Sequence, residues 1–372
     1  MASNRKKKLF SMEKILSWIL ILTILLAGCA MTPPVETPAS ELSPPTDYTI
    51  STDVTTEATE PPTSESTVPP TDEPTTPPTA EPTVPPTAEP TVPPTVAPTT
   101  PPTTQPATPA DSSFAIHFID VGQADAALIL CDGKAMLIDG GNAADSNLMY
   151  TYLKKHNISH LDYVIGTHAH EDHIGGIAGA LNYATVGTAY CPVTSYSTKA
   201  FRNFVSALNQ RGVSITVPTT GHTFSLGSAT CTILAVNTVT DDPNNTSIVL
   251  RIVYGDTSFL FTGDAEREVE QIILDSGIDI RSTVLKVGHH GSKSSTSYYW
   301  LRQIAPEYAV ISVGKGNTYG HPTTEVLSRL RDAEVTTFRT DLQGDIICVS
   351  DGKTVTFTVT RNVNADVFGN LG

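Results

Sequence analysis

One short segment of the sequence concentrates side chains that bind divalent metals. Residues 167–176 read THAHEDHIGG, with three histidines and two carboxylates within six positions. In an extended chain His168 and His170 point to the same side. Asp172 and His173 follow where the chain is expected to turn from a strand into a helix. Because imidazole and carboxylate ligands suit zinc and similar divalent ions, this spacing predicts a metal site rather than a polar surface loop.

Other segments carry carboxylates and histidines next to apolar runs. They are LIDGG at 137–141, TGD at 262–264 and VGHHGS at 287–292. Together with the H-x-H-x-D-H-x-G-G pattern, and in this order, they resemble the motifs of the metallo-β-lactamase superfamily. Three segments resemble more specifically the soluble C-terminal domain of ComEC-type competence proteins: 119–126 (IDVGQADA), 285–293 (LKVGHHGSK) and 316–322 (GNTYGHP). The resemblance extends over residues 114–360.

The resemblance implies one or two divalent ions, zinc or manganese, and assigns their ligands. His168 and His170 would hold one ion, and Asp264 would bridge to the other. The second ion would be held by the remaining ligands, which are Asp172, His173 and one of the pair His289 and His290. We favour His290 because a small turn residue follows it, and we expect His289 in the outer shell; an exchange of these two roles is left open.

One departure from the family pattern concerns the first ion. Many members add a third histidine here, whereas the stretch 242–247 reads DPNNTS and has none. ComEC-like domains have a similar Asn/Ser stretch, and Asn245 and Ser247 are expected in the outer shell. The first site would then bind its metal ion weakly, hold manganese, or be empty in the absence of substrate. An enzyme with a single metal ion is the alternative.

Further residues are expected to support the ligands or the reaction. Asp139 is the candidate to hydrogen-bond a ligand histidine, as outer-shell residues do in metal sites. Asp120 and Ser292 are also placed in the outer shell. Lys293 and His321, together with Asp172, are the catalytic candidates, donating to a phosphate or protonating a leaving group. The alternatives are an ordinary loop role for Ser292 and Lys293 and a helix start for His321.

The resemblance implies hydrolysis by a metal-activated water, because divalent ions lower the pKa of bound water. We expect a phosphodiesterase or nuclease whose substrate is a phosphate ester, with DNA as one candidate. A net charge of −15 argues against a protein that coats nucleic acid. The alternatives are a lactone, amide, β-lactam or phosphocholine-ester hydrolase, and a surface protein that binds metal without turnover.

The N-terminus predicts export. Basic residues at positions 5–8 and 14 precede an apolar run at 15–26, which is short for a bilayer span. The following Leu26-Ala27-Gly28-Cys29 resembles the bacterial lipoprotein cleavage box. Residues 1–29 are therefore interpreted as a signal peptide with Cys29 as the lipidated residue. The expected location is the extracellular face of the bacterial cell membrane.

A Pro/Thr-rich linker is expected at residues 30–112. Between positions 31 and 110 lie 23 of the 28 prolines and eleven carboxylates, without lysine or arginine. Such a chain cannot bury a core, and proline favours extended conformations of about 3.1 Å per residue. The linker would span the cell wall between the membrane and the hydrolase domain. We expect the protein to be a monomer.

Apolar runs and turn signals predict one folded domain at 113–362 and a C-terminal tail at 363–372. Strands are expected at 114–120, 126–131, 135–139, 163–166, 214–217, 229–236, 247–254, 258–262, 283–287, 308–313, 345–350 and 354–360. Helices are expected at 147–157, 174–182, 201–210, 266–274, 298–303 and 324–331. This alternation favours an α/β (α+β) fold in which two sheets are packed together with helices outside, a four-layer αββα sandwich.

Overall fold

A computed structural model describes residues 113–239 and 241–369, which belong to one compact unit. The expected signal peptide with Cys29 and the linker at 30–112 lie outside the described residues. In the part of the chain that is described, none of the helices combines the length and the apolar character needed to cross a bilayer.

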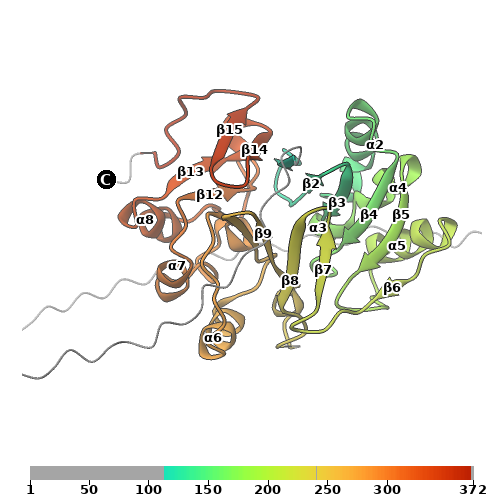
Figure 1. Ribbon diagram of the computed structural model, residues 1–372, viewed down its shortest axis with the longest axis horizontal. Helices are drawn as coiled ribbons and strands as arrows, with labels where there is room; N and C mark the ends of the chain where they lie inside the picture. Colours follow the sequence, from blue (N-terminus) through green and yellow to red (C-terminus); the bar gives the residue numbers. More distant parts are fainter. Residues whose placement is uncertain (1–112, 240, 370–372) are drawn as a thin grey trace, which may run out of the picture. The chain divides into compact units, whose positions relative to one another are not determined.

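Two mixed β-sheets form the centre of the domain (Figure 1). The first sheet has the order β15-β14-β1-β2-β3-β4-β5-β6 and the second the order β13-β12-β11-β10-β9-β8-β7. The strands of the first sheet are β1 (Phe114–Phe118), β2 (Ala127–Cys131), β3 (Lys134–Ile138), β4 (His160–Ile165), β5 (Thr185–Tyr190), β6 (Ile215–Thr216), β14 (Ile346–Ser350) and β15 (Val355–Val359). Those of the second are β7 (Thr223–Leu226), β8 (Ala229–Ala235), β9 (Val249–Tyr254), β10 (Thr257–Phe261), β11 (Val284–Lys286), β12 (Tyr308–Ile311) and β13 (Thr336–Arg339).

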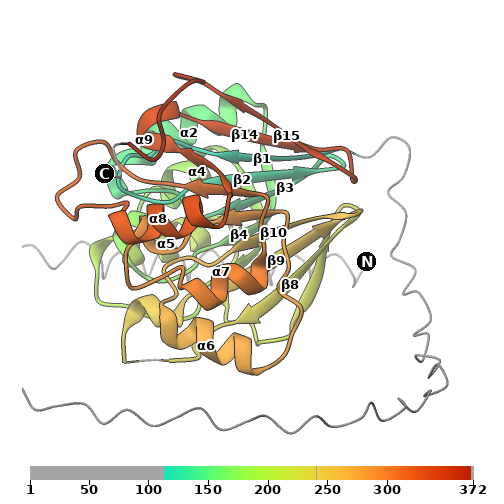
Figure 2. The same cartoon turned by 90° about the vertical axis from the view of Figure 1, so that its left-hand side faces the viewer.

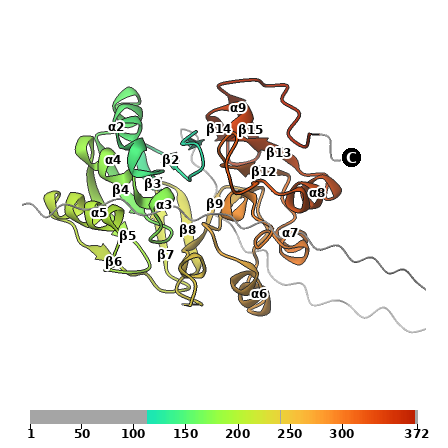
Figure 3. The ribbon, with the colours of Figure 1, turned by 180° about the vertical axis from the view of Figure 1, so that it is seen from behind.

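Helices cover the outer face of each sheet (Figures 1 and 3). On the first sheet lie α2 (Ser146–Lys155), α4 (Ile177–Tyr183) and α5 (Lys199–Gln210). On the second, in the face that Figure 2 presents, lie α6 (Arg267–Asp275), α7 (Tyr298–Ile304) and α8 (Thr324–Asp332). Shorter helical segments are α3 (Glu171–Ile174), α9 (Thr340–Gln343), η1 (Ala143–Asp145), η2 (Pro243–Thr246) and η3 (Gly288–Gly291). The expected four-layer αββα sandwich is therefore confirmed.

Three apolar clusters hold the layers together. The central cluster joins the inner faces of both sheets, where Phe114 stacks on Tyr254 and Phe259 with ring centroids 4.9 and 4.7 Å apart. Two others pack α2, α4 and α5 on the first sheet and α6, α7 and α8 on the second. Each aromatic or aliphatic side chain of this kind stabilises the folded state by about 1.5–3 kcal/mol when it is fully buried. The four cysteines in the described residues are free and buried within this packing.

Some expected elements differ from the observed ones. The sequence analysis missed β5, β7 and β13, and the helix expected at 174–182 is divided into α3 and α4 by Gly175 and Gly176. The tail expected from residue 363 is partly packed, because the Val367 carbonyl accepts a hydrogen bond from Arg339 and Phe368 contacts the cluster under the second sheet. Packing thus continues beyond residue 362.

Parallel strand pairs determine where the polar loops meet. β3 and β4 are parallel. β10, β11 and β12 are parallel too, so that Lys286 at the end of β11 lies between Phe261 and Val310. The carboxyl ends of parallel strands face the same edge of a sheet. The segments that follow these ends are Asp139, Thr167–His173, Thr262–Asp264, His289–His290 and Ser312–His321.

Candidate metal centre

The loop after β4 is fixed by the carboxylate of Asp139. Asp139 Oδ1 accepts a hydrogen bond from the Thr167 amide at 2.8 Å, and Oδ2 accepts one from the Thr167 hydroxyl at 2.8 Å. Asp139 Oδ2 also lies 2.8 Å from His173 Nδ1, and both side chains are buried. This bond leaves His173 Nε2 free to face the ligands of the second sheet. It is the kind of contact that the sequence analysis expected Asp139 to make with a histidine.

Two glycines allow the Asp139 turn to pack against the histidine loop. The Gly140 amide donates to the His173 carbonyl at 2.6 Å, and the Gly176 amide donates to the Gly141 carbonyl at 3.0 Å. A Cβ on Gly176 would lie 2.0 Å from the Gly140 carbonyl oxygen, far inside contact distance. Glycine at position 176 is therefore required for this close approach of two backbones.

Four side chains converge between the two sheets. One ligand atom from each of Asp172, His173, Asp264 and His290 lies within 4.8 Å of the others. Asp264 Oδ2 is 3.3 Å from His173 Nε2 and 3.7 Å from His290 Nε2, and His290 Nε2 is 3.3 Å from Asp172 Oδ2. This set of two imidazoles and two carboxylates matches what a divalent ion such as zinc or manganese requires.

Unpartnered polar atoms support the same assignment. His173 Nε2, His290 Nε2 and Asp264 Oδ1 are buried and have no hydrogen-bond partner among the described residues. Leaving a buried polar atom unpaired costs about 1–3 kcal/mol. The two histidine nitrogens face the same carboxylate, with Asp264 Oδ2 at 3.3 and 3.7 Å, and this arrangement fits the binding of a metal cation.

Burial and neighbouring charges shift the pKa values of the cluster. Burial and the proximity of His173 lower the pKa of His168 well below its usual value. Burial also opposes protonation of His173 and His290, but Asp264 outweighs it, raising the pKa of His173 well above the usual value and that of His290 to about 10. Burial disfavours ionisation of Asp264, yet His173 and His290 hold its pKa well below the usual range. A bound cation would compete with protons for these same atoms.

The other histidines of the loop lie beside this group. His168 Nε2 is 3.0 Å from His170 Nδ1 and 4.0 Å from Asp264 Oδ2. The two imidazoles therefore face each other beside the four-residue group, which includes neither of them. His168 is fully buried and His170 is half-buried. Asp264 Oδ2 thus lies within 4.0 Å of both His168 Nε2 and His173 Nε2, and its role as a bridging ligand stays a prediction.

The His289–His290 pair has an unusual backbone. Their φ angles are 48° and 52°, in the left-handed region that residues with a Cβ rarely adopt. This turn directs both imidazoles towards Asp264: His289 Nε2 lies 3.6 Å from Asp264 Oδ2. Only His290 also approaches Asp172, whereas His289 Nδ1 lies 3.3 Å from Glu266 Oε1. The geometry places His290 within the four-residue group and His289 next to it.

Polar residues before β9 position the Asp264 loop. Ser247 Oγ accepts a hydrogen bond from the Asp264 amide at 3.1 Å, and Asn245 Oδ1 accepts one from the Glu266 amide at 2.9 Å. Asn245 and Ser247 are both buried. The stretch that lacks the family's third histidine thus holds the backbone of the Asp264 segment.

A buried ion pair that the sequence analysis did not assign lies behind His290. Lys286 Nζ is 2.8 Å from Asp125 Oδ2, and Asp125 Oδ1 is 3.2 Å from His290 Nδ1. His290 Nδ1 is also 3.1 Å from the Ser312 carbonyl oxygen. These contacts orient the ring so that its Nε2 faces the cluster. Asp125 and Lys286 both occur in the motifs quoted above, and their charge inside apolar segments is the signal that could have found them.

Two other residues predicted for the outer shell contact groups outside the cluster. Asp120 accepts hydrogen bonds from the Gly122 amide and Arg361, and none of the contacts described for it involves a histidine, so its outer-shell role stays a prediction. Ser292 Oγ is 2.9 Å from Ser294 Oγ.

The two catalytic candidates besides Asp172 also lie away from the four-residue group. Lys293 is exposed on the loop after His290. His321 makes an edge contact with His289, with ring centroids 5.6 Å apart. Burial and the proximity of His289 lower the pKa of His321 to about 4. Its catalytic role stays a prediction, as does that of Lys293.

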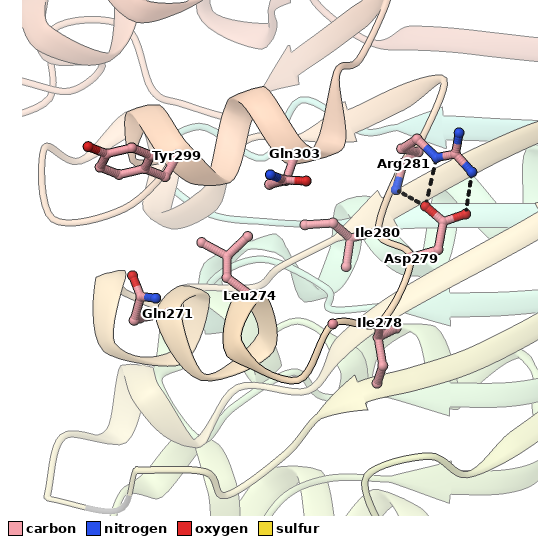
Figure 4. Close-up of a pocket in the computed structure, with 9 residues that line it drawn as sticks. Gln271, Leu274, Ile278, Asp279, Ile280, Arg281, Tyr299 and Gln303 are labelled. Atoms are coloured by element: carbon pink, nitrogen blue, oxygen red, sulfur yellow. Dashed lines mark hydrogen bonds and ion pairs between the residues drawn. The ribbon is translucent and has the colours of Figure 1, made fainter. Parts of the chain in front are cut away.

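A separate cavity of about 640 Å³ lies between α6 and α7 (Figure 4). Its lining includes Leu274, Ile278 and Tyr299, and the Arg281 and Asp279 side chains at one end form an ion pair with each other. None of the four clustered ligands lines it. The four-residue group is therefore independent of this cavity.

The fold and this cluster define a class of protein, in which two stacked mixed sheets with helices outside hold a candidate metal site between them. Residues 119–315 match the sequence profile of the metallo-β-lactamase superfamily. This match covers more than half of the chain, and the chain belongs to that superfamily.

Several curated bacterial proteins are related to it. The ComE operon protein 3 of Bacillus subtilis is 31% identical over 265 residues, which cover 66% of this chain and 34% of that protein. Recombination protein 2 of Haemophilus influenzae is 34% identical over 241 residues, covering 63% and 28%. The chain thus matches about a third of the length of these relatives. Among solved structures, the metallo-β-lactamase fold protein YhfI from Bacillus subtilis aligns with a TM-score of 0.43 and 14% identity, covering 66% of this chain and 100% of that one.

Proposed function

We propose that this member of the superfamily hydrolyses phosphodiester bonds with the help of one or two divalent metal ions. The observation that carries the proposal is the convergence of one ligand atom from each of Asp172, His173, Asp264 and His290 within 4.8 Å, where His173 Nε2 and His290 Nε2 are buried without a hydrogen-bond partner. Such atoms at the junction of two sheets are suited to hold a cation against an anionic substrate.

When bound, a divalent ion would supply an acidified water and positive charge that stabilises the transition state. The chain's own residues would position the ligands of that ion. Asp264, held by the Ser247 hydroxyl, would keep its carboxylate between the two histidine sets. Asp139 and Asp125 would fix the rings of His173 and His290, so that little reorganisation is needed during the reaction.

The proposal of a phosphodiester rests on two supports. Lys293 follows the His290 turn and His321 contacts His289, and they would supply a positive charge and a neutral imidazole that hydrogen-bonds to a phosphate ester. The related proteins carry names that refer to competence and recombination. We infer that the substrate is DNA or a smaller nucleotide phosphodiester.

We further propose that the chain acts at the outer face of a bacterial membrane. This proposal is based on the sequence of residues 1–29, with its basic start, apolar run and Cys29. Two acyl chains on such a cysteine would give stable anchoring, whereas one would not. The Pro/Thr-rich segment would then separate the hydrolase domain from the lipid and span the wall.

The test of the enzymatic proposal uses the full chain in detergent, stripped of metal and reloaded with zinc or manganese. Hydrolysis of a small phosphodiester and of linear DNA is followed for the wild type and for Asp172→Ala and His168→Ala. We expect metal-dependent turnover that falls by at least about 100-fold in both variants. His160→Ala, which removes an exposed histidine hydrogen-bonded to Thr185, should leave the rate unchanged.

The ratio of the hydrolysis rates for linear DNA and for the small phosphodiester then distinguishes a nuclease from an enzyme that acts on small esters. Absence of turnover with both substrates, in protein that has bound metal, would contradict the phosphodiesterase proposal.

A further inference from the structure

An exposed tyrosine lies at the end of a row of rings that starts at the metal-binding cluster. Tyr319 has 71% of its surface exposed and stacks on His321, with ring centroids 5.8 Å apart and planes at 27°. His321 in turn contacts the edge of His289, whose Nε2 is 3.6 Å from Asp264 Oδ2. The row therefore leads from Asp264 to solvent and ends in an uncovered aromatic face.

The loop that carries Tyr319 is held in place before any ligand binds. The side chain of Asn317 spans it: Nδ2 donates to the carbonyls of Gly314 and His321 at 2.9 and 2.6 Å, and Oδ1 accepts from the amides of Tyr319 and His321 at 3.1 and 3.0 Å. The Gly314 amide also donates to Gln123 Oε1 at 3.0 Å. A rigid aromatic side chain loses little conformational entropy when a ligand stacks on it.

The charge around this loop favours an anionic ligand. Residues 314–322 contain Lys315 and no carboxylate, and residues 288–297 contain Lys293 and no carboxylate. Within these two segments the lysines have no acidic neighbour in sequence, and the carboxylates of Glu266 and Asp264 contact His289 at the inner end of the row. An anion that carries a flat ring would satisfy both the lysines and the uncovered face of Tyr319, whereas a neutral sugar would use only the face.

We propose that Tyr319 is a binding residue that stacks a nucleobase next to the phosphodiester held at the cluster, so that the substrate is a nucleotide chain with unpaired bases. This inference rests on the proposed function and narrows its substrate class. Stacking of a base on an aromatic ring tolerates any base sequence, because every base has a flat face. In a duplex the bases are already stacked on each other, so the site selects single strands, overhangs or short oligonucleotides.

The test compares two labelled oligonucleotides of equal length, one of thymidines and one with abasic sugars throughout. Their binding to the full chain in detergent is measured by fluorescence anisotropy in EDTA at low salt. We expect the wild type to prefer the thymidine strand. Tyr319→Ala should weaken binding of that strand by about 5- to 100-fold and leave the abasic strand unchanged. Tyr319→Phe, which keeps the ring, should bind like the wild type.

Tyr299→Ala provides a matched control, because Tyr299 is also 71% exposed but lies on α7 beside the separate cavity in Figure 4. It should not alter binding of either strand. Equal binding of the two strands by the wild type, including no binding of either, overturns the inference, as does a Tyr319→Ala chain that binds thymidines normally.

Failure of the stacking inference can be separated from failure of the proposed function. If the metal-loaded wild type cleaves the abasic and the thymidine strands with the same KM, the phosphodiesterase proposal stands and the stacking inference falls. Stronger binding of a neutral polysaccharide than of thymidines would assign Tyr319 to sugar recognition and would also overturn it.

Discussion

Lys286 and Asp125 form an ion pair of 2.8 Å directly behind the cluster ligand His290. Their side chains are only 5% and 7% exposed. Burial disfavours the charge on Asp125, but Lys286 and His290 outweigh it and lower the pKa of Asp125 well below its usual range. The two charges therefore balance each other inside the protein, and each depends on its partner.

Removing one member of this pair should be costly. Lys286→Met leaves Asp125 buried without its counter-ion, and breaking a buried pair in this way destabilises proteins by about 3–5 kcal/mol. We expect a loss of that size in the free energy of unfolding, measured with urea. Lys134→Met is the matched control, because Lys134 forms an exposed pair with Asp162 and should cost less than about 1 kcal/mol.

The double variant Lys286→Met, Asp125→Leu tests whether the cost comes from the unpaired charge. It should be more stable than Lys286→Met alone, since the carboxylate that lost its lysine partner is removed as well. A double variant whose loss equals the sum of the two single losses would show that the pair is not energetically coupled.

Asp139 should control metal affinity through His173. Asp139→Asn weakens the hydrogen bond to His173 Nδ1 and favours the wrong ring orientation, and such outer-shell changes typically cost 10- to 100-fold in metal affinity. Titration calorimetry of the metal-free chain with zinc would measure this change. Asp162→Asn, which alters a carboxylate paired with Lys134, should retain wild-type affinity. Equal affinities for Asp139→Asn and the wild type would exclude this role for Asp139.

Gly176→Ala should disturb both stability and metal binding. Its Cβ would lie 2.0 Å from the Gly140 carbonyl oxygen, so the histidine loop must move away from the Asp139 turn. We expect a loss of about 3 kcal/mol in urea unfolding together with weaker zinc binding. Gly277→Ala has a positive φ but open space around it and should cost about 1–2 kcal/mol without any effect on zinc. Unchanged zinc affinity in Gly176→Ala would contradict this steric account.

His117, which lies outside the metal-binding cluster, should make the stability of the protein depend on pH. Burial and the proximity of His156 lower the pKa of His117 to about 4, and its Nδ1 lies 2.9 Å from the Tyr152 hydroxyl. The unfolded chain, with an ordinary histidine pKa of about 6.5, binds more protons between these values. Stability therefore falls as the pH decreases from about 6.5 to 4, by about 2 kcal/mol at most.

Urea unfolding at pH 7.5 and 4.5 measures this loss. His117→Gln should show a smaller difference between the two pH values than the wild type, because glutamine does not titrate. His160→Gln, at an exposed position, should behave like the wild type. If His117→Gln lost as much stability between pH 7.5 and 4.5 as the wild type, another group would be responsible for the pH dependence.

Much of the fold could be predicted because local patterns agree with it. The hairpin between β2 and β3 follows from Asp132 and Gly133, which both have the positive φ that such a turn requires. Strands with continuous apolar runs were found, whereas β5 (TVGTAY) was missed because threonine and glycine interrupt its apolar pattern. The division between α3 and α4 follows from the contact of Gly176 with Gly140, which no local pattern contains.

Local spacing indicates a metal site only at His168–His173, and the resemblance to the superfamily was needed to add Asp264 and His290 from distant motifs. Asp139, Asn245 and Ser247 were also expected as supports, whereas other supports were not. Asp125, Lys286 and Glu266 act on His290 and His289 from other loops, and their roles depend on burial and on the register of β11 between β10 and β12. Such long-range contacts cannot be read from one segment at a time.

The most direct test of the whole account is the metal content of the chain. Metal-stripped full-length protein would be dialysed to equilibrium against zinc or manganese and analysed for bound ions. We expect the wild type and Asp279→Ala, which alters an exposed pair with Arg281, to bind at least one ion per chain, and Asp264→Ala to lose affinity by about 100-fold or more. Equal binding by Asp264→Ala and the wild type would contradict the assignment of the cluster as the metal site.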